Sequence, residues 1–138
     1  MLTNVVLIVL MKKKSITKKC PLESTEAKFF IKLCEMNPIL NKYIVMLRND
    51  GTVRNKIEAA ENKRKGLRKG VSDYLLPYPI GRYHGLWIEL KRVNKSISKP
   101  TIDQLKWLSA MKSLNFEAKV AYGGYEAYKI CIDYLKNS

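Results

Sequence analysis

The sequence predicts a single α/β domain in which a mixed β-sheet is flanked by helices. The chain has 138 residues, which is enough for one hydrophobic core and too few for two ordinary domains. Hydrophobic residues make up 46% of the chain, as in folded globular proteins. Segments with helical and strand periodicity alternate along the sequence without an internal repeat, and this order is typical of a sheet between layers of helices.

Eight segments are expected from apolar periodicity and from turn and capping signals. Ser24 or Thr25 begins a first helix, and Asn37-Pro38 ends it. After it we expect a strand, a mostly solvated helix, two strands joined by a turn, a helix capped by Thr101, a strand and a closing helix, at residues 43–48, 53–65, 71–78, 85–91, 101–115, 117–122 and 125–136. The apolar face of the helix after Thr101 is expected to contain Ile102, Leu105, Leu108 and Met111.

Positive charge dominates the composition. Lys and Arg number 26 against 12 Asp and Glu, which gives a net charge of +14. Such an excess attracts polyanions, because neutralised phosphates release their counterions. Nucleic acid is the partner that this favours, while an anionic membrane surface and simple solubility remain open alternatives. Basic residues that flank the strands 71–78 and 85–91 are expected to contact nucleic acid: Arg54, Arg64, Lys65, Arg68, Lys69, Arg92 and Lys95.

The cysteines do not form a metal or disulfide pattern. Cys20, Cys34 and Cys131 are widely spaced, and the only histidine is His84. This spacing favours neither a zinc site nor a disulfide framework. Cys34 and Cys131 have apolar neighbours, so we expect buried free thiols in a reducing cytoplasm.

The segment before the expected domain is apolar and then basic. Residues 1–11 are apolar, and a basic linker follows over 12–22. The apolar run is too short to cross a bilayer and lacks the features of a secretory signal. We expect no membrane partner, and a basic membrane-surface protein that uses this apolar run is the competing hypothesis. An extra strand, a partner-binding arm and an extension ahead of a start at Met11 remain open. The domain itself is expected over residues 23–138.

Three charged residues stand on otherwise apolar strands. Glu89 and Lys91 lie two apart on one expected strand, so their side chains leave the same face. Asp73 lies on the preceding strand, which is also largely apolar. If the two strands pair, the three charges converge. Two carboxylates can hold a hard cation such as Mg²⁺, and a nearby ammonium can act on a phosphate. A purely structural ion pair on an edge strand is the alternative.

Several segments of the sequence match the motifs of a known protein family. The segments GVSD (70–73) and YHGLWIELK (83–91), the Q-x-x-W helix (104–107), the A-x-V-x-x-G strand (118–123) and the final YL resemble the virus-type replication-repair nuclease (VRR-NUC) family of the PD-(D/E)xK superfamily. The resemblance covers roughly residues 24–136. It implies a restriction-endonuclease-like αβββαβ core with a mixed central sheet.

The resemblance also implies roles for individual residues. Asp73 and Glu89 would be metal ligands for Mg²⁺, or Mn²⁺ as a substitute, with the Ile88 carbonyl as a further ligand. Lys91 would be the catalytic lysine. Glu26 would be an accessory acid near the metal, and Gln104 a helix residue that faces the site. This sequence departs from the family pattern in two places, with Ser72 where proline is common and with an Asn49-Asp50-Gly51 turn where Asn-Gly-Gly is commoner.

Several of these residues have alternative interpretations. Gln104 can close a capping box with Thr101 instead of facing the site. His84 precedes the strand at a turn, which favours a hydrogen-bonded or phosphate-contacting histidine over a catalytic base. Trp107 is expected in the core rather than as a platform for bases. Glu26 lies three, four and seven residues before Phe29, Phe30 and Leu33, so its side chain is expected to face the core. Glu23 could replace it as the helix acid, but the helical phase of Glu23 does not match the core face.

The expected function is that of a metal-dependent endonuclease. The resemblance is to phage and bacterial stand-alone members, which implies a homodimer that cleaves branched DNA such as Holliday junctions or flaps in DNA repair. A phage-encoded protein of this kind would work in the cytoplasm of its bacterial host. A basic DNA-binding module that keeps the fold without catalysis is the alternative.

Overall fold

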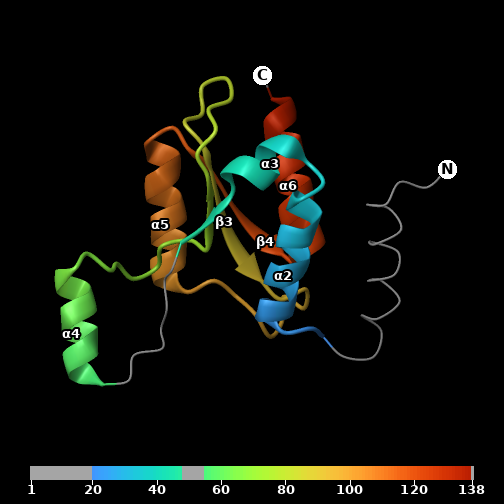
Figure 1. The fold of residues 1–138 in the computed structure, drawn as a ribbon. Helices are drawn as coiled ribbons and strands as arrows, with labels where there is room; N and C mark the ends of the chain where they lie inside the picture. The colour runs from blue at the N-terminus through green and yellow to red at the C-terminus, as the bar shows by residue number, and fades with distance from the viewer. Residues whose placement is uncertain (1–19, 48–54, 138) are drawn as a thin grey trace.

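Four strands form one mixed sheet at the centre of the computed structural model, which describes residues 20–47 and 55–137 (Figure 1). The strands are β1 (Val45–Met46), β2 (Tyr74–Leu76), β3 (Leu86–Lys91) and β4 (Glu117–Tyr122), in the order β1-β2-β3-β4. The first two pairings are antiparallel, whereas β3 and β4 are parallel. A parallel pair needs a crossover connection, and helix α5 (Ile102–Ser113) provides it.

Helices cover both faces of this sheet. Helices α2 (Glu23–Cys34) and α6 (Gly124–Lys136) pack against each other and against β3 on one face, and α5 packs against β3 and β4 on the other (Figure 1). All six residues of β3 are buried, as expected for a central strand between two layers. The predicted mixed sheet flanked by helices is therefore confirmed.

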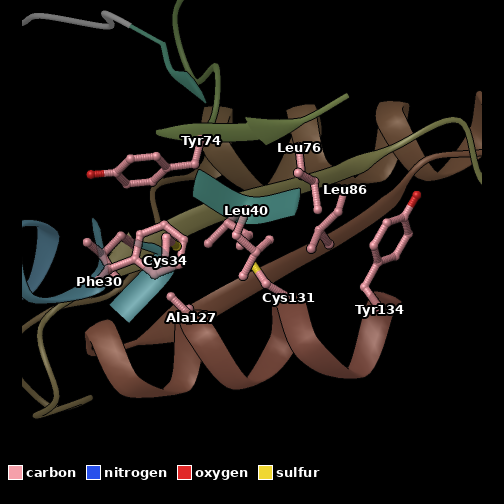
Figure 2. Close-up of a cluster of buried hydrophobic side chains, with 12 residues drawn as sticks. Phe30, Cys34, Leu40, Tyr74, Leu76, Leu86, Ala127, Cys131 and Tyr134 are labelled. Atoms are coloured by element: carbon pink, nitrogen blue, oxygen red, sulfur yellow. The ribbon is translucent and has the colours of Figure 1, made fainter. Parts of the chain in front are cut away.

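The larger core lies between the sheet and helices α2 and α6. Side chains from these two helices, together with Leu40 from the segment after α2, meet alternate residues of β2 and β3. Figure 2 labels Phe30, Cys34, Leu40, Tyr74, Leu76, Leu86, Ala127, Cys131 and Tyr134 in this core. Cys34 and Cys131 are free thiols in this core, as predicted, and Cys20 is a half-buried free thiol. Burial raises the pKa of the Cys34 thiol to about 12, so both core cysteines act as small apolar side chains.

A smaller core lies under α5 on the opposite face. The buried residues are Trp87, Leu108, Met111 and Ala118, and Trp107 packs against them with its ring edge-on to Trp87 at 5.3 Å between centroids. Trp107 is therefore part of the packing, as predicted. Because Trp87 is on the same face of β3 as Glu89, this core closes one side of the charged cluster.

The predicted apolar face of α5 is wrong in its first half. Leu108 and Met111 are buried, but Ile102 is 73% exposed and Leu105 is 49% exposed. The four positions are spaced by three residues, and a helix advances about 100° per residue. Ile102 and Met111 therefore point in nearly opposite directions, and a spacing of three alone cannot define one face.

The first helices also differ from the prediction. Helix α2 begins at Glu23, with Leu22 at its N-cap and no side-chain cap, so neither Ser24 nor Thr25 caps it. It ends near Asn37 as expected. A second helix, α3 (Pro38–Tyr43), begins there, because the Asn37 side chain accepts hydrogen bonds from the amides of Ile39 and Leu40. An Asn-Pro pair can thus end one helix and start the next.

The remaining boundaries are close to the prediction. The strands expected at 43–48 and 71–78 are shorter than expected, as β1 and β2, whereas β3, α5, β4 and α6 begin and end within about two residues of their expected bounds. The solvated helix is α4 (Lys56–Arg64), capped by the Asn55 side chain. Residues 1–19 and the turn at 49–51 lie outside the described residues. Within 20–47 and 55–137, every helix is too short or too polar to span a bilayer.

We expect Leu86→Ala to lower the free energy of unfolding by about 2–5 kcal/mol, because Leu86 is 0% exposed in the central strand and its truncation leaves a cavity. Urea denaturation monitored by tryptophan fluorescence would measure the change. Ile97→Ala is the matched control, because Ile97 is 55% exposed, and it should change the free energy by no more than about 0.5 kcal/mol. An equal effect of both variants would contradict this assignment of the core.

Candidate active site

The site is built on the face of β3 that α5 covers. Alternation along the strand places Trp87, Glu89 and Lys91 on this face, while Leu86, Ile88 and Leu90 point into the larger core. Glu89 is 1% exposed and Lys91 is 8% exposed. The Lys91 ammonium lies 3.3 Å from Glu89 Oε1, so two charges that β3 carries two residues apart form a buried ion pair.

Asp73 joins this pair from the neighbouring strand. The antiparallel register pairs Tyr74 with Ile88, which sets Asp73, just before β2, opposite Glu89. Asp73 Oδ2 accepts a hydrogen bond of 2.7 Å from the backbone amide of Leu90. The convergence expected from the sequence is therefore present, and the carboxylate of Asp73 is held by the backbone of the strand that carries Glu89.

Gln104 has both of the roles that the sequence left as alternatives. Its side-chain Oε1 accepts a 2.7 Å hydrogen bond from the backbone amide of Thr101. The backbone amide of Gln104 donates to Thr101 Oγ1, and the two bonds together form the capping box. Its Nε2 donates a 2.6 Å hydrogen bond to Glu89 Oε1. The side chain thus connects the N-terminus of α5 to the buried carboxylate of β3.

The surroundings of Glu89 and Asp73 raise the pKa of both carboxyl groups and so favour their protonated forms. Burial and the neighbouring Asp73 carboxylate raise the pKa of Glu89 to about 8, although Lys91 opposes the shift. Burial also raises the pKa of Asp73, against the opposing effects of the Leu90 amide and of Lys91. Two carboxylates at close range in a desolvated site repel each other, so a proton or a cation relieves the repulsion.

The free oxygen of Glu89 fits a cation. Glu89 Oε2 is buried and accepts no hydrogen bond from the described residues, whereas Oε1 is held by Gln104 and Lys91. The Ile88 side chain is 0% exposed in the core, so only its backbone is available to the site. Among residues 20–47 and 55–137 no three His, Cys, Asp or Glu side chains form a metal cluster. Two carboxylates completed by carbonyl and water oxygens suit Mg²⁺, which keeps much of its hydration.

The fold of this chain is similar to that of a solved structure. A solved structure described as a VRR_NUC domain protein matches with a TM-score of 0.73 and 22% sequence identity, over 87% of this chain and 93% of that one. The chain has the VRR_NUC fold. The resemblance stated from the sequence motifs is thereby confirmed for the fold. No family model and no curated protein matches the sequence.

In this VRR_NUC fold, Glu26 is buried on α2, as the sequence predicted for its helical phase. It is 2% exposed, and its Oε2 accepts a 2.6 Å hydrogen bond from the amide of Gly124 at the start of α6. A carboxylate at a helix N-terminus binds the free amides and the positive end of the helix dipole. Glu26 therefore ties α2 to α6, and its role as an accessory acid near a metal stays a prediction.

Glu23, one turn earlier on α2, interacts electrostatically with the site. Burial raises the pKa of Glu23; Lys91 and Arg92 oppose the shift, and the Asp73 carboxylate adds to it. The Arg92 side chain holds this end of α2 by donating to the carbonyls of Pro21 at 2.9 Å and Cys20 at 2.8 Å. Helical phase predicts Glu26 as the acid of this helix. The contacts of Arg92 bring the start of α2, with Glu23, close to the end of β3, and sequence spacing cannot reveal such contacts.

The residues predicted to contact DNA differ in their surroundings. Arg64, Lys65, Arg68 and Lys69 are exposed, and Lys95 lies over the Tyr122 ring at 4.7 Å from its centroid. Arg92 is half-buried, and the two hydrogen bonds to residues 20 and 21 occupy part of its guanidinium. Arg54 lies outside the described residues. All seven remain predicted DNA contacts, and Arg92 has a structural role as well.

Two further residues named from the sequence lie at the ends of β3 and β2. His84 is exposed at the turn before β3, where its amide donates to the Asn115 carbonyl and its ring contacts Phe116 edge-on. Ser72 is 0% exposed, and its hydroxyl has no hydrogen-bond partner among the described residues.

Without divalent cations, we expect the protein to lose stability as the pH rises from about 4.5 to about 8. The pKa of Glu89 is raised from 4.5 to about 8 in the folded state, so in this range the folded protein holds a proton that the unfolded chain has released. The effect is absent below the lower value and complete above the upper one. Urea denaturation in EDTA at several pH values would measure it. Glu89→Gln should flatten the dependence, and parallel curves for the two proteins would contradict the assignment.

Proposed function

We propose that this protein is a metal-dependent endonuclease that hydrolyses phosphodiester bonds in DNA. The observation that carries the proposal is the group formed by buried Glu89 and Lys91 on β3 and half-buried Asp73 just before β2, with one carboxylate oxygen of Glu89 left without a partner among the described residues. The VRR_NUC fold and the net charge of +14 support it. The resemblance of the motifs to PD-(D/E)xK nucleases implies the same reaction.

Two carboxylates and one backbone carbonyl form the proposed metal site. Asp73 and Glu89, with the Ile88 carbonyl, would hold Mg²⁺ or Mn²⁺. Such an ion would supply Lewis acidity, which polarises a phosphoryl oxygen and lowers the pKa of water. Gln104 fixes Glu89 Oε1, which leaves Oε2 for this purpose. The Leu90 amide fixes the other carboxylate through Asp73 Oδ2.

We propose that Lys91 acts on the phosphate group of the DNA. Its ammonium lies 3.3 Å from Glu89 Oε1, and only 10% of the side chain is exposed, so it is held in one region of the site. From there it can donate to a phosphoryl oxygen as negative charge develops, or orient the attacking water. An ammonium in a desolvated site stabilises such charge more strongly than one in water.

Branched DNA, such as a Holliday junction or a flap, is the proposed substrate, and the proposed active form is a homodimer. The resemblance to stand-alone phage and bacterial family members supports both. Resolving a junction needs two cuts related by symmetry, which two copies of one small site can provide.

We expect Lys91→Ala to slow DNA cleavage by about a hundredfold or more, because it removes the cation that would stabilise the transition state. The measurement is cleavage of labelled single-strand, duplex, flap and four-way-junction DNA in Mg²⁺. The matched control is Lys129→Ala, because Lys129 is an exposed lysine on α6. This variant should cleave DNA at the wild-type rate.

Two outcomes would count against the proposal. Equal cleavage by wild type and Lys91→Ala would remove Lys91 from the reaction. Tight binding of these DNAs by wild type without cleavage of any of them would favour a non-catalytic DNA-binding module.

We also expect Mg²⁺ to bind more tightly as the pH rises from 6 to 8. The raised pKa of Glu89 means that the cation must displace a proton in this range. Isothermal titration calorimetry in buffers of different ionisation enthalpy would detect the released proton. Asp73→Asn should abolish binding, and Lys129→Ala should leave it unchanged. A pH-independent affinity would show that the cation binds elsewhere.

A further inference from the structure

A basic arm stands apart from the sheet (Figure 1). It comprises α4 and the turn that follows it, residues 55–69. Six of its side chains are basic and two are acidic. The acidic Glu61 pairs within the arm, with Arg64 at 3.2 Å and Lys65 at 3.9 Å, so the remaining surface is strongly positive.

The arm has almost no packing to stabilise its helix. None of the nine residues of α4 is buried, and Ile57, its largest apolar side chain, is 81% exposed. Helices this short are marginal in water even with good helix-forming residues. The Asn55 cap and exposed ion pairs add only a little stability. A partner outside the described residues would therefore stabilise α4.

The base of the arm is held beside the candidate site. Gly70, which directly follows the arm, has φ +81°, and a Cβ there would lie 2.4 Å from the backbone carbon and oxygen of Asp103. Only glycine allows this approach to the first turn of α5. Asp103 precedes Gln104, which binds Glu89, and Asp73 follows Gly70 by three residues. A polyanion seated on the arm would thus continue directly into the site.

We propose that α4 and its following turn form an arm that binds the phosphate backbone of DNA next to the cleaved bond, and that this contact stabilises the helix. The inference rests on the proposed function for the identity of the polyanion. Charge complementarity argues for DNA. Lys63, Arg64 and Lys65 are adjacent cations that repel one another, and DNA phosphates would neutralise their charges. The helix is about 13 Å long, which corresponds to about four base pairs along a duplex.

The test is binding of a fluorescent four-way junction and a duplex, measured by anisotropy in EDTA at several salt concentrations. The arm variant is Lys63→Ser, Arg64→Ser and Lys65→Ser combined. We expect its Kd to rise about tenfold or more at physiological salt, and the slope of log K against log salt to fall by about 2 to 3. The matched control is Lys32→Ser, Lys129→Ser and Lys136→Ser, three exposed lysines on the helices of the opposite face, with the same loss of charge.

A second variant tests the helix without changing the charge. Ala60→Gly, at an exposed position of α4, disfavours the helix and should weaken DNA binding by about fivefold if the helix forms on DNA. An unchanged Kd for Ala60→Gly would overturn the stabilisation of the helix by DNA.

The outcomes separate this inference from the proposed reaction. Binding in EDTA involves no hydrolysis, so the arm can be tested even if no cleavage is found. Equal losses of affinity in the arm and control variants would overturn the inference, because they would reflect total charge alone. Unchanged DNA affinity with a shift in sedimentation from dimer to monomer would also overturn it and would assign the arm to contacts between two copies of the chain.

Discussion

The buried carboxylate of Glu89 is the constraint on which the arrangement of the site depends. A charge in the interior of a sheet is costly unless other groups compensate it. Here Lys91 and Gln104 hold one oxygen, while burial and the adjacent Asp73 carboxylate raise the pKa of Glu89. The compensation is incomplete, since the second oxygen lacks a partner among the described residues. Such a site is compatible with a stable fold, and it leaves one buried carboxylate oxygen for the cation proposed above.

Gln104 shows that structural and chemical roles can share one side chain. Its carbonyl oxygen completes the N-terminal cap of α5, and its amide nitrogen holds Glu89. The start of the crossover helix is therefore fixed by the same residue that fixes the carboxylate. The interpretations that compete at the level of sequence are compatible in three dimensions, because an amide side chain carries a donor and an acceptor on different atoms.

The sequence predicts the sheet and the central charges well because both follow from local periodicity. Strand alternation places Glu89 and Lys91 on one face. The connection through residues 77–85 makes β2 and β3 antiparallel neighbours, which brings Asp73 to these two residues. Contacts between distant segments are not encoded in spacing. The hydrogen bond from Gly124 to Glu26 joins residues 98 positions apart, and Arg92 reaches back to the start of α2. These contacts between distant segments fix the surroundings of Glu26 and of the start of α2, and helical phase alone could not predict them.

The hydrogen bond from the Leu90 amide to Asp73 has a consequence for how the chain reaches its native state. The bond exists only when β2 and β3 pair in one register, and sliding either strand by a single residue would turn its side chains to the other layer. A misaligned hairpin would separate Asp73 from Glu89 while leaving the helices free to form. Correct alignment and assembly of the charged group are thus a single event during folding, and only correctly aligned molecules contain the assembled group.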